Sequence, residues 1–119
     1  MNGWIKLHYK MKKWEWIGKP NTVAVWLHCL LSANWEEKRW QGITIKRGSF
    51  ITSYKNFSEH VGLSVQQTRT ALANLQSTGE LIIKSTNKYT EISINNYIEY
   101  QLNNKQTTNK QQQLKNIRI

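Results

Sequence analysis

The sequence predicts an α+β fold, and three observations in its middle part lead to this prediction. Apolar residues recur at helical spacing over residues 55–61 and again over residues 64–77, with the tight turn Gly62-Leu63-Ser64 between them. Two short segments rich in β-branched residues follow, residues 81–84 and 89–94, separated by a polar connection. Helix, glycine turn, helix and hairpin in this order are typical of a winged helix-turn-helix.

An additional N-terminal helical layer is expected before this unit. Pro20 favours the first turn of a helix over about residues 21–33, with Asn21 or Thr22 as its cap. The spacing predicts that its buried face consists of Val23, Trp26, Leu27, Leu30 and Leu31. Further upstream we expect an extended segment over residues 4–7. A short helix should follow over residues 8–16, with three apolar side chains turned inward: Trp14, Trp16 and Ile17.

Extended structure is predicted for residues 35–53, between this layer and the helix-turn-helix. Residues 35–40 consist of four charged residues between two tryptophans and are interpreted as a polar connection. Residues 42–46 alternate as a strand does, and Arg47-Gly48 predicts a turn. A second short strand over residues 49–53 then leads into the helix over residues 55–61.

The helix that begins at Ser64 has local signals at both ends and two distinct faces. Ser64 is suited to be its N-cap, and Gly79 suits a left-handed ending just past the last turn. Four residues form one inward stripe at helical spacing: Thr68, Ala71, Leu72 and Leu75. The opposite face is polar and contains no carboxylate before Glu80: Gln66, Thr70, Ala73 and Ser77, flanked by Gln67, Arg69 and Asn74.

Amide, hydroxyl and guanidinium groups without acids can hydrogen-bond base edges and phosphates of double-stranded DNA. We therefore expect a DNA interface made by this helix, by the hairpin and by nearby lysines. Its candidate residues are Ser64, Gln66, Gln67, Arg69, Thr70 and Asn74 on the helix, Lys84 and Lys88 on the hairpin, and Lys55 and Lys46 near it. An ordinary solvated or protein-binding helix face is the alternative interpretation of the same pattern.

Composition limits the class of protein. The chain has 119 residues and a net charge of +10, which favours polyanionic partners in general. We expect one domain over residues 1–100 and a flexible tail over residues 101–119, where eleven residues are Asn, Gln or Thr. The single Cys29 excludes an internal disulfide, and no apolar run is long enough for a membrane span, so a cytoplasmic location is expected.

No enzyme is expected from these residues. The sequence contains no CxxC, HExxH or P-loop motif and no paired carboxylates of a catalytic site, so no cofactor or metal is predicted. His28 and Cys29 are adjacent on one predicted helix and point about 100° apart, which is poor geometry for a shared metal.

Several segments together resemble the N-terminal winged-helix domain of phage and prophage replication-initiation proteins, the DnaD-like replisome organisers. They are Gly48-Ser49-Phe50-Ile51-Thr52-Ser53, Gly62-Leu63-Ser64, Arg69-Thr70-Ala71-Leu72, Ser77-Thr78-Gly79-Glu80-Leu81-Ile82 and Lys84-Ser85-Thr86-Asn87-Lys88-Tyr89-Thr90, with flanks at residues 4–7 and 96–101. The resemblance covers residues 4–101 and implies origin binding and primosome assembly, with replication proteins as further partners. Gln67-Thr68 departs from the Thr-Val or Thr-Ile of the family, which puts a less apolar residue on the inward stripe.

Other functions of a winged helix remain open at this point. A winged helix can mediate oligomerisation or docking, and Trp35 and Trp40 would then be candidate anchors of a homodimer or another protein contact. A transcriptional regulator is a further alternative, because the same helix would contact DNA there. Many of the relatives continue into a second domain that contacts the helicase loader, and since this sequence stops in a linker-like tail, no loading role is expected.

Overall fold

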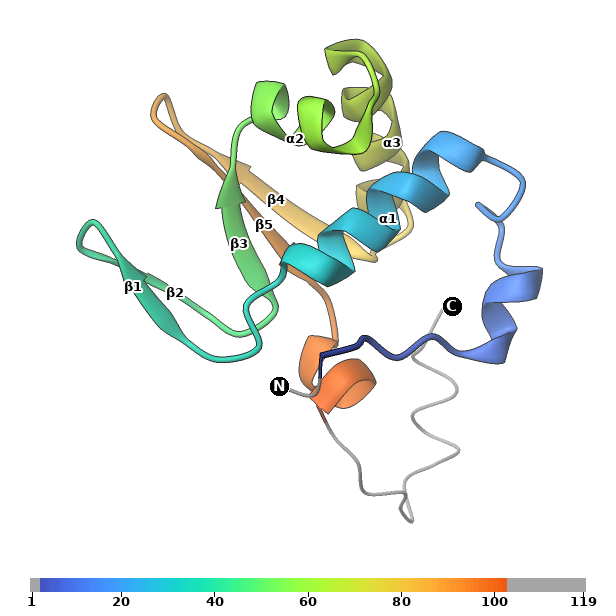
Figure 1. The fold of residues 1–119 in the computed structure, drawn as a ribbon, viewed down its shortest axis with the longest axis horizontal. Helices are drawn as coiled ribbons and strands as arrows, with labels where there is room; N and C mark the ends of the chain where they lie inside the picture. Colours follow the sequence, from blue (N-terminus) through green and yellow to red (C-terminus); the bar gives the residue numbers. More distant parts are fainter. Residues whose placement is uncertain (1–2, 103–119) are drawn as a thin grey trace.

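The computed structural model describes residues 3–102, and the α+β class is confirmed (Figure 1). Three α-helices are present in this range, α1 (Pro20–Ser32), α2 (Tyr54–Val61) and α3 (Val65–Ser77). One small sheet pairs β1 (Lys38–Trp40) with β2 (Ile43–Ile45). The other contains β3 (Ser49–Thr52), β4 (Leu81–Ser85) and β5 (Thr90–Ile94). A short 3₁₀-helix, η1 (Tyr9–Lys13), and a single π-helical turn, η2 (Ile98–Leu102), lie at the two ends.

The three-stranded sheet has the antiparallel order β3-β5-β4, and the helices lie on one of its faces (Figure 1). Side chains alternate between the two faces of a strand, and the pairs Leu81↔Ile94 and Ile83↔Ile92 lie on the face that meets the helices. Phe50 on β3 joins them and stacks near Phe57 of α2, with 6.3 Å between the ring centroids. This face and the three helices enclose one hydrophobic core.

The predicted turn between α2 and α3 is confirmed in detail. Gly62 ends α2 with a φ of +75°, a conformation in which a side chain on any other residue would be strained. Ser64 then caps α3, as expected, because its hydroxyl accepts a hydrogen bond from the backbone N–H of Gln67. The predicted inward stripe is also confirmed, since Thr68, Ala71, Leu72 and Leu75 are all buried.

The N-terminal layer differs from its prediction in rotation and length. Helix α1 begins at Pro20, and Lys19 precedes it without a capping side-chain bond, so the expected cap by Asn21 or Thr22 is wrong. Its buried face consists of Thr22, Val25, Trp26, Cys29 and Leu30. Leu31 was expected inside but is 63% exposed, and Ile17 is 44% exposed. An almost uniformly apolar helix has no polar face to fix its rotation, and the neighbours decide it.

A hairpin replaces the polar connection expected over residues 35–40. Lys38, Arg39 and Trp40 form β1 and pair with Ile45, Thr44 and Ile43 of β2. The Trp40 ring meets the Tyr89 ring edge-on, with 5.6 Å between their centroids. The alternation of residues 42–46 predicted the strand β2 correctly. Its partner β1 was missed because Lys38 and Arg39 are charged and the segment has no alternation of apolar and polar residues.

The folded part continues past the predicted boundary at residue 100. Gln101 is buried, and its side-chain amide accepts from the Lys6 N–H at 2.8 Å and donates to the Lys6 carbonyl at 2.8 Å. This exchange holds residues 4–7, which form no strand, against η2. The predicted flexible tail is therefore wrong for residues 101 and 102, and its remainder, residues 103–119, lies outside the described residues.

Thr68 is the one polar member of the inward stripe of α3, and its environment leads to a stability prediction. It is fully buried, and its hydroxyl has no hydrogen-bond partner within residues 3–102. Thr68→Val removes this unpaired hydroxyl at nearly constant shape, so we expect the free energy of unfolding to rise by about 1 kcal/mol in urea titrations. Thr70→Val on the exposed face is the control and should change it by less than about 0.5 kcal/mol. A destabilised Thr68→Val protein would contradict the unpaired hydroxyl.

Candidate nucleic-acid interface

The polar face of α3 predicted from the sequence is open to solvent. Gln66, Thr70, Ala73 and Ser77 are all exposed, and α1 packs against α3 (Figure 1). The Gln66 amide donates to the Thr70 hydroxyl at 3.3 Å, one turn further along the same face. The amide and hydroxyl groups on which the DNA hypothesis depends are therefore accessible.

Ser64 and Gln67 have a structural role at the start of α3. They form a reciprocal capping box, in which the Gln67 side-chain oxygen accepts from the Ser64 N–H at 2.9 Å. The Ser64 hydroxyl is held in the same box by the Gln67 N–H. In this box Ser64 fixes the start of the helix. The side-chain oxygen of Gln67 is engaged, whereas its side-chain NH₂ group is available to a ligand.

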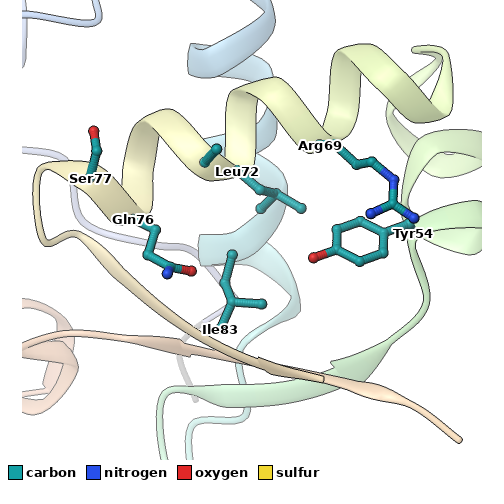
Figure 2. A pocket seen from close by; sticks show the side chains of 7 residues that line it. Tyr54, Arg69, Leu72, Gln76, Ser77 and Ile83 are labelled. Atoms are coloured by element: carbon teal, nitrogen blue, oxygen red, sulfur yellow. The ribbon is translucent and has the colours of Figure 1, made fainter. Parts of the chain in front are cut away.

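Arg69 is exposed, and its guanidinium lies over an aromatic ring. Its guanidinium carbon lies 4.2 Å from the centroid of the Tyr54 ring, at the start of α2. Figure 2 shows the side chain running along the helix surface to a position over this ring. A cation over an aromatic face is attracted to it, so the guanidinium is held beside α3 on the side that faces the hairpin. Tyr54 is thus a member of the site that the sequence analysis missed.

Asn74 is engaged within the fold, and its role as a DNA-contact residue stays a prediction. It is half-buried, and its amide donates to the hydroxyl of Thr22 on α1 at 3.1 Å. Beside this bond lies an open groove of about 620 Å³ between α3 and residues 16–22, with Gln66, Gln67 and Thr70 on one wall and Lys19 on the other. The N-terminal layer therefore flanks the polar face without covering it, and Lys19 is a second residue that the sequence analysis missed.

The carboxylate that follows α3 in the sequence is turned into the fold. Glu80 is buried, and it accepts hydrogen bonds from the Trp14 indole N–H at 3.4 Å and from the Thr78 hydroxyl. Trp16 adds a bond from its indole N–H to the same Thr78 hydroxyl at 2.9 Å. Because these partners hold Glu80 inside, its negative charge does not face a polyanion bound at α3.

The four predicted lysines are all exposed but do not share one surface. Lys88 lies in the hairpin loop, where Thr86 fixes the backbone by accepting from the N–H groups of Lys88 and Tyr89, both at 3.1 Å. Lys55 follows Tyr54 at the start of α2, at the same end of the sheet, because Thr52 pairs with Thr90.

Lys84 and Lys46 lie elsewhere on the fold. Lys84 pairs with Glu91 on the sheet face that points away from the helices, so a carboxylate lies opposite it. Lys46 precedes β3 at the end where Ser49 pairs with Ser93, the opposite end from the hairpin loop. Lys55 and Lys88 therefore share one end of the sheet, and the role of all four lysines in DNA binding stays a prediction.

The titratable groups of α1 lie away from this surface. Burial raises the pKa of the Cys29 thiol far above its usual range, so it stays protonated and serves as a core residue. Burial and the nearby His60 lower the pKa of His28, whose ring stacks on that of His60 at 5.7 Å.

Comparisons with family models, with curated proteins and with solved structures found no match to this chain. Among residues 3–102, no helix is both long and apolar enough to cross a membrane. The same part of the chain contains no cluster of three or more His, Cys, Asp or Glu side chains placed to hold a metal ion.

The Asn74 bond can be tested apart from ligand binding. Asn74→Ala removes the donor to the buried Thr22 hydroxyl, which destabilises the fold, whereas alanine has the higher helix propensity. We expect the first effect to be larger, with a net loss of about 1 kcal/mol in the free energy of unfolding. Gln66→Ala, on the exposed face of the same helix, should change it by less than about 0.5 kcal/mol. Urea denaturation followed by tryptophan fluorescence measures both. Equal stability of the two variants would return Asn74 to the set of free surface residues.

Proposed function

We propose that residues 20–94 form a winged helix-turn-helix that binds duplex DNA, with α3 in the major groove and the β4–β5 hairpin as its wing. One observation carries this proposal: α3 exposes a face of amides and hydroxyls next to a hairpin that bears lysines, while Glu80, the acid that follows this helix, is buried. The element order α1-β3-α2-α3-β4-β5 and the sheet order β3-β5-β4 support it, because they bring the second helix and the hairpin to neighbouring positions.

In this proposal the contacts divide into two kinds. Gln66, Thr70 and the Gln67 amide are the groups on α3 that would reach base edges, and a Gln amide suits adenine. Lys55 and Lys88 would neutralise phosphates on either side of the helix, which sets the register but is independent of sequence. Lys19, across the groove from Gln66, would add a third phosphate contact. The net charge of +10 supports a polyanionic partner.

The biological context that we propose is replication initiation of a phage or prophage, with transcriptional regulation as the alternative. It rests on the resemblance of residues 4–101 to replisome organisers. The Gly62-Leu63-Ser64 turn and the Ser77-Thr78-Gly79-Glu80 ending are the strongest parts of this resemblance, since both have local structural causes here.

The test compares two lysines of the same hairpin that differ in surroundings. Binding of a labelled duplex is followed by fluorescence anisotropy at several salt concentrations for the parent, Lys88→Ala and Lys84→Ala. Each phosphate contact contributes about −0.9 to the slope of log K against log salt, so Lys88→Ala should flatten the slope by about that amount. Lys84→Ala should leave the slope unchanged, because Lys84 faces Glu91 on the far side of the sheet. Equal slopes for all three proteins would remove the hairpin from the interface.

A protein-interaction module is the second candidate, and exposed tryptophans favour it. The side chains of Trp35 and Trp40 are 37% and 36% exposed to solvent. An apolar surface of this kind would be covered in a homodimer. Size-exclusion chromatography with light scattering separates the candidates: a tight dimer without affinity for any duplex supports the interaction module, and a monomer that binds duplex supports the DNA-binding domain.

A further inference from the structure

A pocket of about 320 Å³ lies between α3, the start of α2 and β4, on the hairpin side of the proposed DNA-binding helix. Its apolar walls are Leu72 and Ile83, and its polar groups come from Tyr54, Arg69 and Gln76. Figure 2 shows the Tyr54 hydroxyl directed toward the space between Leu72 and Ile83, and the Gln76 amide directed toward Ile83 from the other side. Neither the sequence analysis nor the duplex contacts proposed above account for this pocket.

The polar groups of the pocket are available to a ligand. The Tyr54 hydroxyl and the Gln76 amide form no hydrogen bond to another side chain or to the backbone within residues 3–102. Ser77, on the rim, differs from them because its hydroxyl already donates to the Asn74 carbonyl at 2.6 Å. The guanidinium carbon of Arg69 lies 4.2 Å from the centroid of the Tyr54 ring, and the Arg69 side chain is exposed.

We propose that this pocket binds a single unpaired nucleobase of a DNA strand that lies against α3. Apolar walls that accept a planar ring, a stacking cation and an amide with both donor and acceptor atoms are the features by which proteins hold an unstacked base. Ile83 would contact the ring, because Leu72 behind it is only 1% exposed. Arg69 would stack beside the ring, and Gln76 would pair with its polar edge. The proposal rests on the proposed function, because the strand reaches the pocket only from the DNA-binding surface.

The lining argues against a phosphate in the same place. Arg69 is the only cation among the lining residues, and it lies at one side, whereas Leu72 and Ile83 would desolvate a charged oxygen without replacing its hydrogen bonds. A neutral aromatic ring loses little by entering such a pocket. The absence of an acidic residue from the lining also suits a base that arrives attached to a polyanionic backbone.

The experiment measures the contribution of the bases themselves. Anisotropy compares the affinity of the protein for three labelled probes: a paired duplex, a short thymidine oligonucleotide, and an abasic strand of the same length with the same phosphates. Because stacking of one base on such a surface is worth a measurable factor, we expect the thymidine strand to bind about fivefold or more tightly than the abasic strand. Equal affinity for the two single strands, with the duplex still bound, overturns the pocket and leaves the proposed function intact.

Two exposed amides provide a matched pair of variants. Gln76→Ala removes the amide inside the pocket, so the ratio of thymidine to abasic affinity should fall toward one while the duplex affinity stays at the parent value. Asn56→Ala, on the exposed side of α2 and outside both the pocket and the proposed duplex contacts, should keep the ratio of the parent. A ratio that falls equally in both variants overturns the assignment to this pocket. A parent protein that binds none of the three probes would contradict the proposed function, and with it the base pocket.

Discussion

The burial of a single stripe of α3 is the constraint on which the rest of the structure depends. Thr68, Ala71, Leu72 and Leu75 pack against α1, α2 and the sheet, and burial of each leucine alone contributes about 1.5–3 kcal/mol. A helix has one rotation at a time, so this burial also decides which residues face outward. Gln66 and Thr70 are exposed because they lie on the side of the helix away from the buried stripe. The unpaired hydroxyl of Thr68 is tolerated because the apolar burial around it outweighs its cost.

The N-terminal layer affects the candidate interface through charge as well as packing. Glu80 directly follows α3, where an exposed carboxylate would repel a polyanion. A buried carboxylate is costly unless hydrogen bonds replace its water, and the Trp14 indole and the Thr78 hydroxyl supply them. Trp14 comes from a segment more than sixty residues earlier. The layer that the sequence analysis regarded as a packing element therefore also removes a negative charge from the surface beside α3.

The sequence predicted those features of the fold that depend on neighbouring residues, and it did not predict contacts between residues far apart in the chain. The turn at Gly62, the cap at Ser64 and the inward stripe of α3 follow from nearby residues alone, and all three predictions are confirmed. The rotation of α1 was wrong because an almost uniformly apolar helix fits several orientations. Partners distant in the sequence could not be predicted either: Asn74 bonds to Thr22 and Arg69 lies over Tyr54, and no local pattern indicates either contact. The sheet face on which Lys84 lies was equally hidden, because one step along a strand changes the face.

Arg69 connects the two proposed contacts and limits what each can do. A guanidinium held over Tyr54 is attracted by roughly 0.5–1 kcal/mol at an exposed site, so it leaves the ring only for a partner that offers more. A guanine edge in the major groove, paired through two hydrogen bonds, offers about 1–3 kcal/mol and could draw it out, and so could a phosphate through charge-assisted hydrogen bonds. In the proposed complex Arg69 would therefore leave the Tyr54 ring wherever such a partner comes within reach. Elsewhere it would stay at the pocket, and base reading would fall to Gln66 and Thr70.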